Sequence, residues 1–114
     1  MQLDIVLYAM EFSDYISEAV KTAKPWDSKE FGLAYLGLGL AGESGEVVDM
    51  LKKGFSGAKE LNIEELKKEL GDVMWYIANL CHALDLDMDE VLEMNIAKLR
   101  KRHGTAWSGY GKRD

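Results

Sequence analysis

Apolar residues return every three or four positions in four successive segments of this chain, and that spacing restricts the chain to helical architectures. The most regular stripe lies in the third segment and consists of Leu66, Leu70, Val73, Ile77, Leu80, Cys81 and Leu84. A similar stripe in the first segment contains Ile5, Ala9, Phe12, Ile16 and Val20. No region alternates with a period of two for long enough to indicate a strand. The predicted fold class is therefore all-α.

Capping residues and helix breakers set the expected limits of the four helices. The spacing predicts helices over about residues 3–23, 28–54, 62–85 and 87–102. The first should stop at Lys24-Pro25, and the other three should begin at capping boxes. These boxes are Asp27-x-x-Glu30, Asn62-x-x-Glu65 and Asp87-x-x-Glu90. The Gly-rich, aromatic stretch of residues 105–114 is predicted to be irregular.

Length and charge narrow the class of protein further. With 114 residues the chain has room for one domain, expected to span residues 1–114. The net charge of −6 makes duplex nucleic acid a poor partner. Neither a signal peptide nor a long apolar run is present, so a soluble, cytoplasmic protein without a membrane segment is expected. The single Cys81 suits a reducing compartment and a structural role.

Two pairs of carboxylates stand out against this background. Glu43-x-x-Glu46 falls in the second predicted helix and Glu69-x-x-Asp72 in the third. At about 100° per residue, Glu43 lies on the same arc as the apolar residues of its helix, and Glu46 lies about 60° to the side. If the two helices pack antiparallel, the four carboxylates approach one another. Because clustered carboxylates repel each other unless a cation neutralises them, the pattern predicts a divalent-metal site.

The ligand type indicates which metal to expect. Sites made only of oxygen ligands suit Mg²⁺, with Mn²⁺ as a substitute, whereas zinc favours His and Cys. His82 and His103 form no Glu-x-x-His pair with a suitable carboxylate, which argues against a di-iron bundle. Either carboxylate pair alone would fit a solvated helix face, so the prediction depends on both pairs flanking apolar stripes.

Glycines interrupt the second predicted helix at Gly37, Gly39, Gly42 and Gly45. Each costs about 1 kcal/mol relative to alanine inside a helix, so something must offset the cost. Two explanations remain open, namely close helix packing and access of a bulky ligand to the carboxylates. The spacing Gly37-x-Gly39-x-x-Gly42 also matches a dinucleotide-binding fingerprint, but the preceding strand and parallel sheet that this motif requires are missing.

Three runs of the sequence stand out together, namely Gly42-Glu43-Ser44-Gly45-Glu46-Val47-Val48-Asp49, Glu69-Leu70-Gly71-Asp72-Val73 and Asn95-x-x-Lys98-Leu99-Arg100-x-Arg102. With these runs the chain resembles the MazG-like family of all-α nucleotide pyrophosphohydrolases. The resemblance covers about residues 28–104, with both acidic motifs in the family's order and spacing. It implies a four-helix bundle-like fold assembled as a homodimer or a dimer of dimers. It also implies Mg²⁺-dependent cleavage of a nucleoside triphosphate between its α and β phosphates.

The resemblance also suggests roles for individual residues. Metal binding and catalysis would fall to Glu43, Glu46, Glu69 and Asp72. One carboxylate of the Glu43/Glu46 pair would instead activate the attacking water, and the sequence leaves open which. The family's phosphate-contacting strip would correspond to Asn95, Lys98 and Arg102, with Lys53 as a weaker candidate. The alternative for that strip is a solvated basic helix end favoured by the helix dipole.

Aromatic residues are candidates for binding the base of a nucleotide, because an aromatic face can stack on any nucleobase. Tyr76 is the best placed, one turn after Asp72, and Trp26 is a second candidate, whereas Trp75 suits the core or an interface equally well. After Arg102 the sequence departs from the commonest ending of the family, which leaves the role of Trp107 and Tyr110 open.

Three functions therefore stay in view. The first is a pyrophosphohydrolase acting on nucleoside triphosphates, the second is a phosphoribosyl-ATP pyrophosphatase with related acidic motifs, and the third is a non-catalytic helical module that binds a nucleotide or a partner. A homodimer or homotetramer is expected in each case, because a chain this small exposes much of its apolar stripes.

Overall fold

The computed structural model describes residues 10–109, and within them it contains four α-helices and no strand. These helices are α1 (Phe12–Lys21), α2 (Lys29–Ser56), α3 (Ile63–Ala83) and α4 (Met88–His103). The all-α fold class is thereby confirmed. The first helix is shorter than the predicted 3–23, because it begins at Phe12, with residues 10–11 outside it, and ends at Lys21. The part of that prediction before residue 10 lies outside the described residues, as do the last five residues of the tail. Residues 105–109 form no helix, as predicted.

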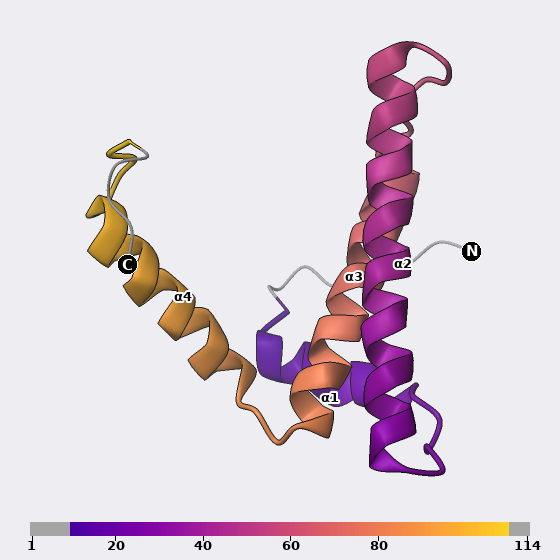
Figure 1. Cartoon of the computed structure of the whole chain (residues 1–114), viewed down its shortest axis with the longest axis vertical. Coiled ribbons are helices and arrows are strands. Elements are labelled where there is room, and N and C mark those ends of the chain that lie inside the picture. Colours follow the sequence, from indigo (N-terminus) through magenta and orange to yellow (C-terminus); the bar gives the residue numbers. More distant parts are fainter. Residues whose placement is uncertain (1–9, 110–114) are drawn as a thin grey trace.

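Helices α2 and α3 form a long antiparallel pair, joined by a short turn (Figure 1). Gly57 ends α2 in the left-handed conformation, with φ of 79°, which glycine adopts without steric cost. Leu36 of α2 is buried in this packing. Gly39 faces the ring of Tyr76 so closely that a Cβ atom there would overlap the ring. Close helix packing therefore explains Gly39, one of the four glycines singled out in the sequence of α2.

The first turns of the helices confirm one predicted cap and correct two. The Oδ1 atom of Asn62 accepts a hydrogen bond from the Glu65 amide at 3.2 Å, as its capping box predicts. The Asp27-x-x-Glu30 box was wrong, because Ser28 is the N-cap and its hydroxyl accepts from Phe31 N. At α4 the cap is Asp87, but its carboxylate accepts from the amide of Asp89, two residues on. The starts of α2, α3 and α4 each lie within two residues of the predicted capping boxes, although the hydrogen-bond partners of two caps differ from the prediction.

Helix α1 packs across the C-terminal half of α3. Their shared core contains Ala19, Ala78, Cys81 and Met88, with Tyr15, Ile16, Met74, Trp75 and Ile77 packed around it. The indole N–H of Trp75 donates to the hydroxyl of Thr22 at 2.7 Å, which ties the end of α1 to α3. Cys81 is a buried free thiol in this core, in line with the structural role expected for it.

Helix α4 leaves the core after its first residue. Met88 is buried, but the rest of the helix projects away from α2 and α3 (Figure 1). Its apolar stripe is consequently exposed along Val91, Leu92, Ile96 and Leu99. The described part of one chain therefore does not close a four-helix bundle. None of the described helices has the length and apolar character that crossing a membrane requires.

Candidate metal centre

Three of the four predicted carboxylates converge between α2 and α3. Oxygen atoms of Glu43, Glu69 and Asp72 all lie within 4.8 Å of one another. Glu43 and Glu69 are half-buried and Asp72 is exposed. The spacing follows from the fold, because Glu69 and Asp72 share one face of α3 and the antiparallel packing brings Glu43 of α2 opposite them. We call these three residues the acidic cluster.

The close approach of the three carboxylates raises the pKa of Glu43. A hydrogen bond with the Glu69 carboxyl is the main cause that raises the pKa of Glu43 above its ordinary value. Burial adds to the rise, as do the negative charges of Asp72, Glu69 and Glu46. Each of these causes disfavours the charged form of the Glu43 carboxyl, and a cation bound between the carboxylates would offset their mutual repulsion. Three convergent carboxylate oxygens suit a hard divalent cation such as Mg²⁺.

Glu46 lies beside the acidic cluster but is not one of its three members. Its side chain is exposed, and its charge contributes to the raised pKa of Glu43. It also contributes to the raised pKa of Lys53, which is due mainly to the hydrogen bond between Lys53 and Asp49. The Nζ atom of Lys53 lies 2.7 Å from the Asp49 carboxylate. Lys53 therefore forms an ion pair with Asp49, which lies about one helical turn after Glu46.

Two tyrosines that the sequence did not single out interact with the site: Tyr15 with Asp72 of the acidic cluster, and Tyr35 with Tyr76. Burial is the main cause that raises the pKa of Tyr15, on α1, and the charge of Asp72 adds to it. Burial likewise raises the pKa of Tyr76, to which Tyr35, as a hydrogen-bond partner, and Glu43 contribute. Tyr35 precedes Glu43 by two helical turns, a spacing that offered a signal. For Tyr15 no spacing relates α1 to Asp72, so only tertiary packing reveals it.

The predicted base-binding residues form a connected aromatic surface at one end of the cluster. The rings of Trp26 and Tyr35 lie 4.7 Å apart, and Tyr35 leads on to Tyr76. Gly32 allows the approach of Trp26, because a Cβ atom there would come within 2.6 Å of its indole. Tyr35, which the sequence did not single out, thus links Trp26 to Tyr76, the member of this aromatic surface that interacts with Glu43.

The predicted phosphate strip lies elsewhere. Asn95, Lys98 and Arg102 are on α4, which projects away from the α2–α3 pair that carries the acidic cluster (Figure 1). Within one chain the structure does not bring this strip to the carboxylates.

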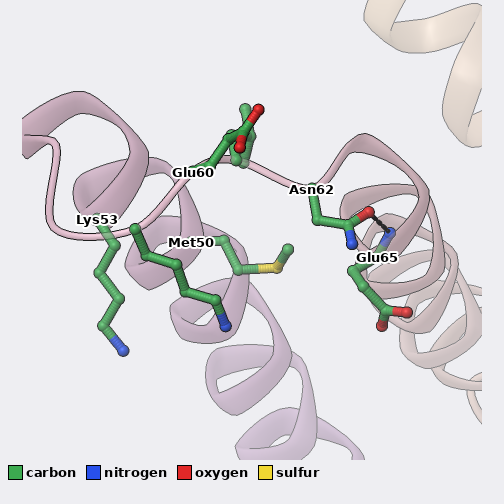
Figure 2. A pocket seen from close by; sticks show the side chains of 7 residues that line it. Met50, Lys53, Glu60, Asn62 and Glu65 are labelled. Atoms are coloured by element: carbon green, nitrogen blue, oxygen red, sulfur yellow. Dashed lines mark hydrogen bonds between the residues drawn. The ribbon is translucent and has the colours of Figure 1, made fainter.

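A small cavity of about 140 Å³ lies at the turn between α2 and α3 (Figure 2). Its walls come from Met50, Lys53, Lys59, Glu60, Leu61, Asn62 and Glu65. No member of the acidic cluster lines it, so the open cluster between the helices, rather than this cavity, is the candidate site. The figure also shows the hydrogen bond by which Asn62 caps α3 next to the cavity.

Comparison with known proteins agrees with this geometry. The sequence model of the MazG nucleotide pyrophosphohydrolase domain matches residues 31–107, which include both halves of the acidic cluster. The chain is also 40% identical over 75 residues to "Gene 37 protein" of Mycobacterium phage L5. That match covers 62% of this chain and 66% of the phage protein, just under two thirds of its length. No solved structure matches the chain significantly. The match over most of its length shows that the chain belongs to the MazG nucleotide pyrophosphohydrolase domain family.

Proposed function

We propose that this protein is a Mg²⁺-dependent nucleoside triphosphate pyrophosphohydrolase. It would cleave a ribo- or deoxyribonucleoside triphosphate between the α and β phosphates and release the monophosphate and pyrophosphate. The observation that carries the proposal is the convergence of Glu43, Glu69 and Asp72 inside the region that matches the MazG domain. MazG domains generally hydrolyse nucleotide pyrophosphate bonds with a divalent metal, and nucleotides of this kind occur in the cytoplasm, where we place the protein.

The acidic cluster would hold the metal, with Mn²⁺ as an alternative to Mg²⁺. A bound divalent cation supplies charge neutralisation for the triphosphate and makes a nearby water more acidic. The three carboxylates of the cluster fix the position of that charge between α2 and α3. A cation bound there would also let a protein of net charge −6 accept a polyanionic substrate, because the carboxylates alone would repel the phosphates.

Glu46 is our candidate for the group that orients and deprotonates the attacking water. It follows Glu43 by three residues, so it lies on a neighbouring face of α2, and it is exposed to solvent. Because it is not part of the acidic cluster, its carboxylate can accept a proton without giving up a metal ligand. This assigns the two residues of the Glu43-x-x-Glu46 pair different roles, which the sequence left open.

The aromatic surface of Trp26, Tyr35 and Tyr76 would bind the base. It adjoins the cluster at Tyr76, whose pKa the charge of Glu43 helps to raise. A base stacked there would place its triphosphate along the carboxylates. The face of an aromatic ring accepts every base, so the surface supports nucleotide binding without naming a preferred one.

Contacts to the phosphates from Asn95, Lys98 and Arg102 require an assembly of copies. In one chain α4 points away from the cluster, so we assign that role to α4 of a neighbouring copy in a homodimer or homotetramer. Arg and Lys suit it, because they compensate the negative charge of a transferred phosphoryl group.

The experiment that tests this function measures pyrophosphate release from each NTP and dNTP, and from nucleotides with modified bases, with Mg²⁺ and with EDTA. We expect pyrophosphate and the corresponding monophosphate from at least one substrate, and no release in EDTA. Activity confined to phosphoribosyl-ATP would replace the proposal with a phosphoribosyl-ATP pyrophosphatase. Absence of release across the whole panel would remove the enzyme and leave a binding module.

A further inference from the structure

Helix α2 carries a second apolar stripe on the side away from α3. The face toward α3 contains Leu36 and Leu40, and Leu38 lies two positions from both, about 160° around the helix from each. The second stripe follows a spacing of three and four residues through Phe31, Ala34, Leu38, Ala41, Gly45 and Val48, and its last apolar member, Phe55, follows after seven residues because Lys52 holds the intervening position. We call these residues the outer seam. A helix that is apolar on two opposite sides needs a partner on each side.

Within the described residues the outer seam is largely uncovered. Phe31, Leu38, Val48 and Phe55 are 55%, 76%, 62% and 97% exposed, and the ring of Phe31 lies 6.3 Å from that of Trp26. Large apolar side chains at these exposures along one side of a helix indicate an interaction surface. In Figure 1 only α3 runs beside the upper part of α2, so no described helix covers the seam there.

Small residues occupy the middle of the seam and large residues its ends. Ala41 and Gly45 lie at the centre, and no atom comes within 4 Å of the place where a Cβ would stand on Gly45. The same holds for Gly37, at the border of the seam. No contact among residues 10–109 accounts for Gly37 and Gly45, whereas the close approach of Tyr76 accounts for Gly39. A second helix approaching closely at the centre of the seam would offset the roughly 1 kcal/mol that each glycine costs.

We propose that the outer seam binds the outer seam of a second copy, with the two α2 helices antiparallel about a two-fold axis near residue 43. The sequence of the seam is nearly the same read in both directions, as a two-fold interface requires. In this register Phe31 of one copy meets Phe55 of the other, Leu38 meets Val48, and Ala41 meets Gly45. The large residues then pair at both ends while the small residues let the backbones approach at the crossing point.

The charges beside the outer seam and the length of the seam support α2 of a second copy as its partner. Lys52, on the seam between Val48 and Phe55, lies opposite Ala34 of the second copy in the antiparallel register, one turn from that copy's Glu30, so opposite charges approach each other near each end of the seam. The seam runs for about 36 Å along α2, by the rise of 1.5 Å per residue. The 16 residues of α4 reach only about 24 Å, so α4 of a second copy is too short to cover it.

A partner that covers the outer seam would leave the acidic cluster accessible. Glu43 shares the side of α2 that faces α3, opposite the seam, and both copies would keep their carboxylates accessible. This inference rests on the proposed homo-oligomer, but it uses no part of the proposed chemistry.

The first test is the mass of the protein in solution, measured by light scattering and sedimentation at micromolar concentration. We expect the wild type to be at least a dimer and Leu38→Glu to raise the dissociation constant of the dimer by about 100-fold or more, because two charges would enter a dry interface. Leu86→Glu is the matched control, since Leu86 is 50% exposed in the turn before α4 and outside the seam. A monomeric wild type, or equal weakening by both substitutions, would overturn the proposal.

The second test fixes the register by disulfide trapping under mild oxidation. A mixture of differently tagged Leu38→Cys and Val48→Cys proteins should form a mixed disulfide dimer. Leu38→Cys alone should not cross-link, because the two cysteines would lie about 15 Å apart along the axis, beyond the reach of a disulfide of about 7 Å. The wild type controls for the buried Cys81. Self-linking of Leu38→Cys, or a dimer that gives no mixed disulfide, would overturn the antiparallel seam whether or not the protein hydrolyses nucleotides.

Discussion

Replacing Glu69 by Gln is expected to lower pyrophosphate release by roughly 10²- to 10⁴-fold, the range seen when an active site loses an electrostatic or acid–base group. Glutamine keeps the size of the side chain but removes one of the three negative charges that would hold the metal. The same change removes the hydrogen-bonding carboxyl that raises the pKa of Glu43. Steady-state rates over a Mg²⁺ titration would check it, and excess Mg²⁺ should restore only part of the activity.

The matched control for this variant is Glu64→Gln on the same helix. Glu64 lies in the first turn of α3 and contacts Lys67 in an exposed ion pair at 2.9 Å, away from the acidic cluster. Exposed pairs contribute about 0–1 kcal/mol, so its loss should leave both folding and turnover close to the wild type. If Glu69→Gln retained full activity, or if Glu64→Gln lost as much, the acidic cluster would not be the catalytic centre.

Gly39→Ala is expected to destabilise the protein by about 1–3 kcal/mol, in the range of overpacked cores. The added methyl group would overlap the ring of Tyr76, which is held on its other sides by α3 and by Tyr35. Relief of the overlap has to separate α2 from α3 at the level of the acidic cluster, so turnover should fall together with stability. Urea unfolding followed by tryptophan fluorescence measures the first effect.

Gly42→Ala provides the contrast in the same helix. No atom lies within 4 Å of the Cβ position on Gly42, so alanine fits there and should stabilise α2 by up to about 1 kcal/mol through its higher helix propensity. Opposite signs for two identical substitutions three residues apart would identify close packing against Tyr76 as the reason for Gly39. A stabilised Gly39→Ala would contradict this account of the α2–α3 packing.

Local sequence signals predicted most of the helical structure. The stripes of α2 and α3 end at residues whose chemistry fixes the boundary, namely Gly57 in its left-handed conformation and Asn62 as a cap. Caps were less exact where several polar residues compete, so Ser28 took the place expected for Asp27. The position of α4 was beyond reach of the sequence, since an exposed stripe specifies that a helix needs a partner but not whether the partner belongs to the same chain.

The candidate site was predictable to the extent that it depends on helix periodicity. Three carboxylates met as the spacing of the two acidic pairs indicated, because antiparallel helices of known register bring such faces together. Glu46 lay outside this group, since the 60° between it and Glu43 is enough to turn its side chain toward solvent. Tyr15 and the separation of α4 from the cluster depend on the angles between helices, and residue spacing within a helix carries no information about those.

The proposed function depends on carboxylates from two neighbouring helices that hold a divalent cation for phosphate chemistry. A crystal grown with Mn²⁺ and a non-hydrolysable nucleoside triphosphate, measured at the manganese absorption edge, would test this directly. We expect anomalous density within coordination distance of Glu43, Glu69 and Asp72, with the triphosphate against it. Carboxylates that point apart into solvent with no anomalous density between them, in crystals that contain the nucleotide, would contradict it.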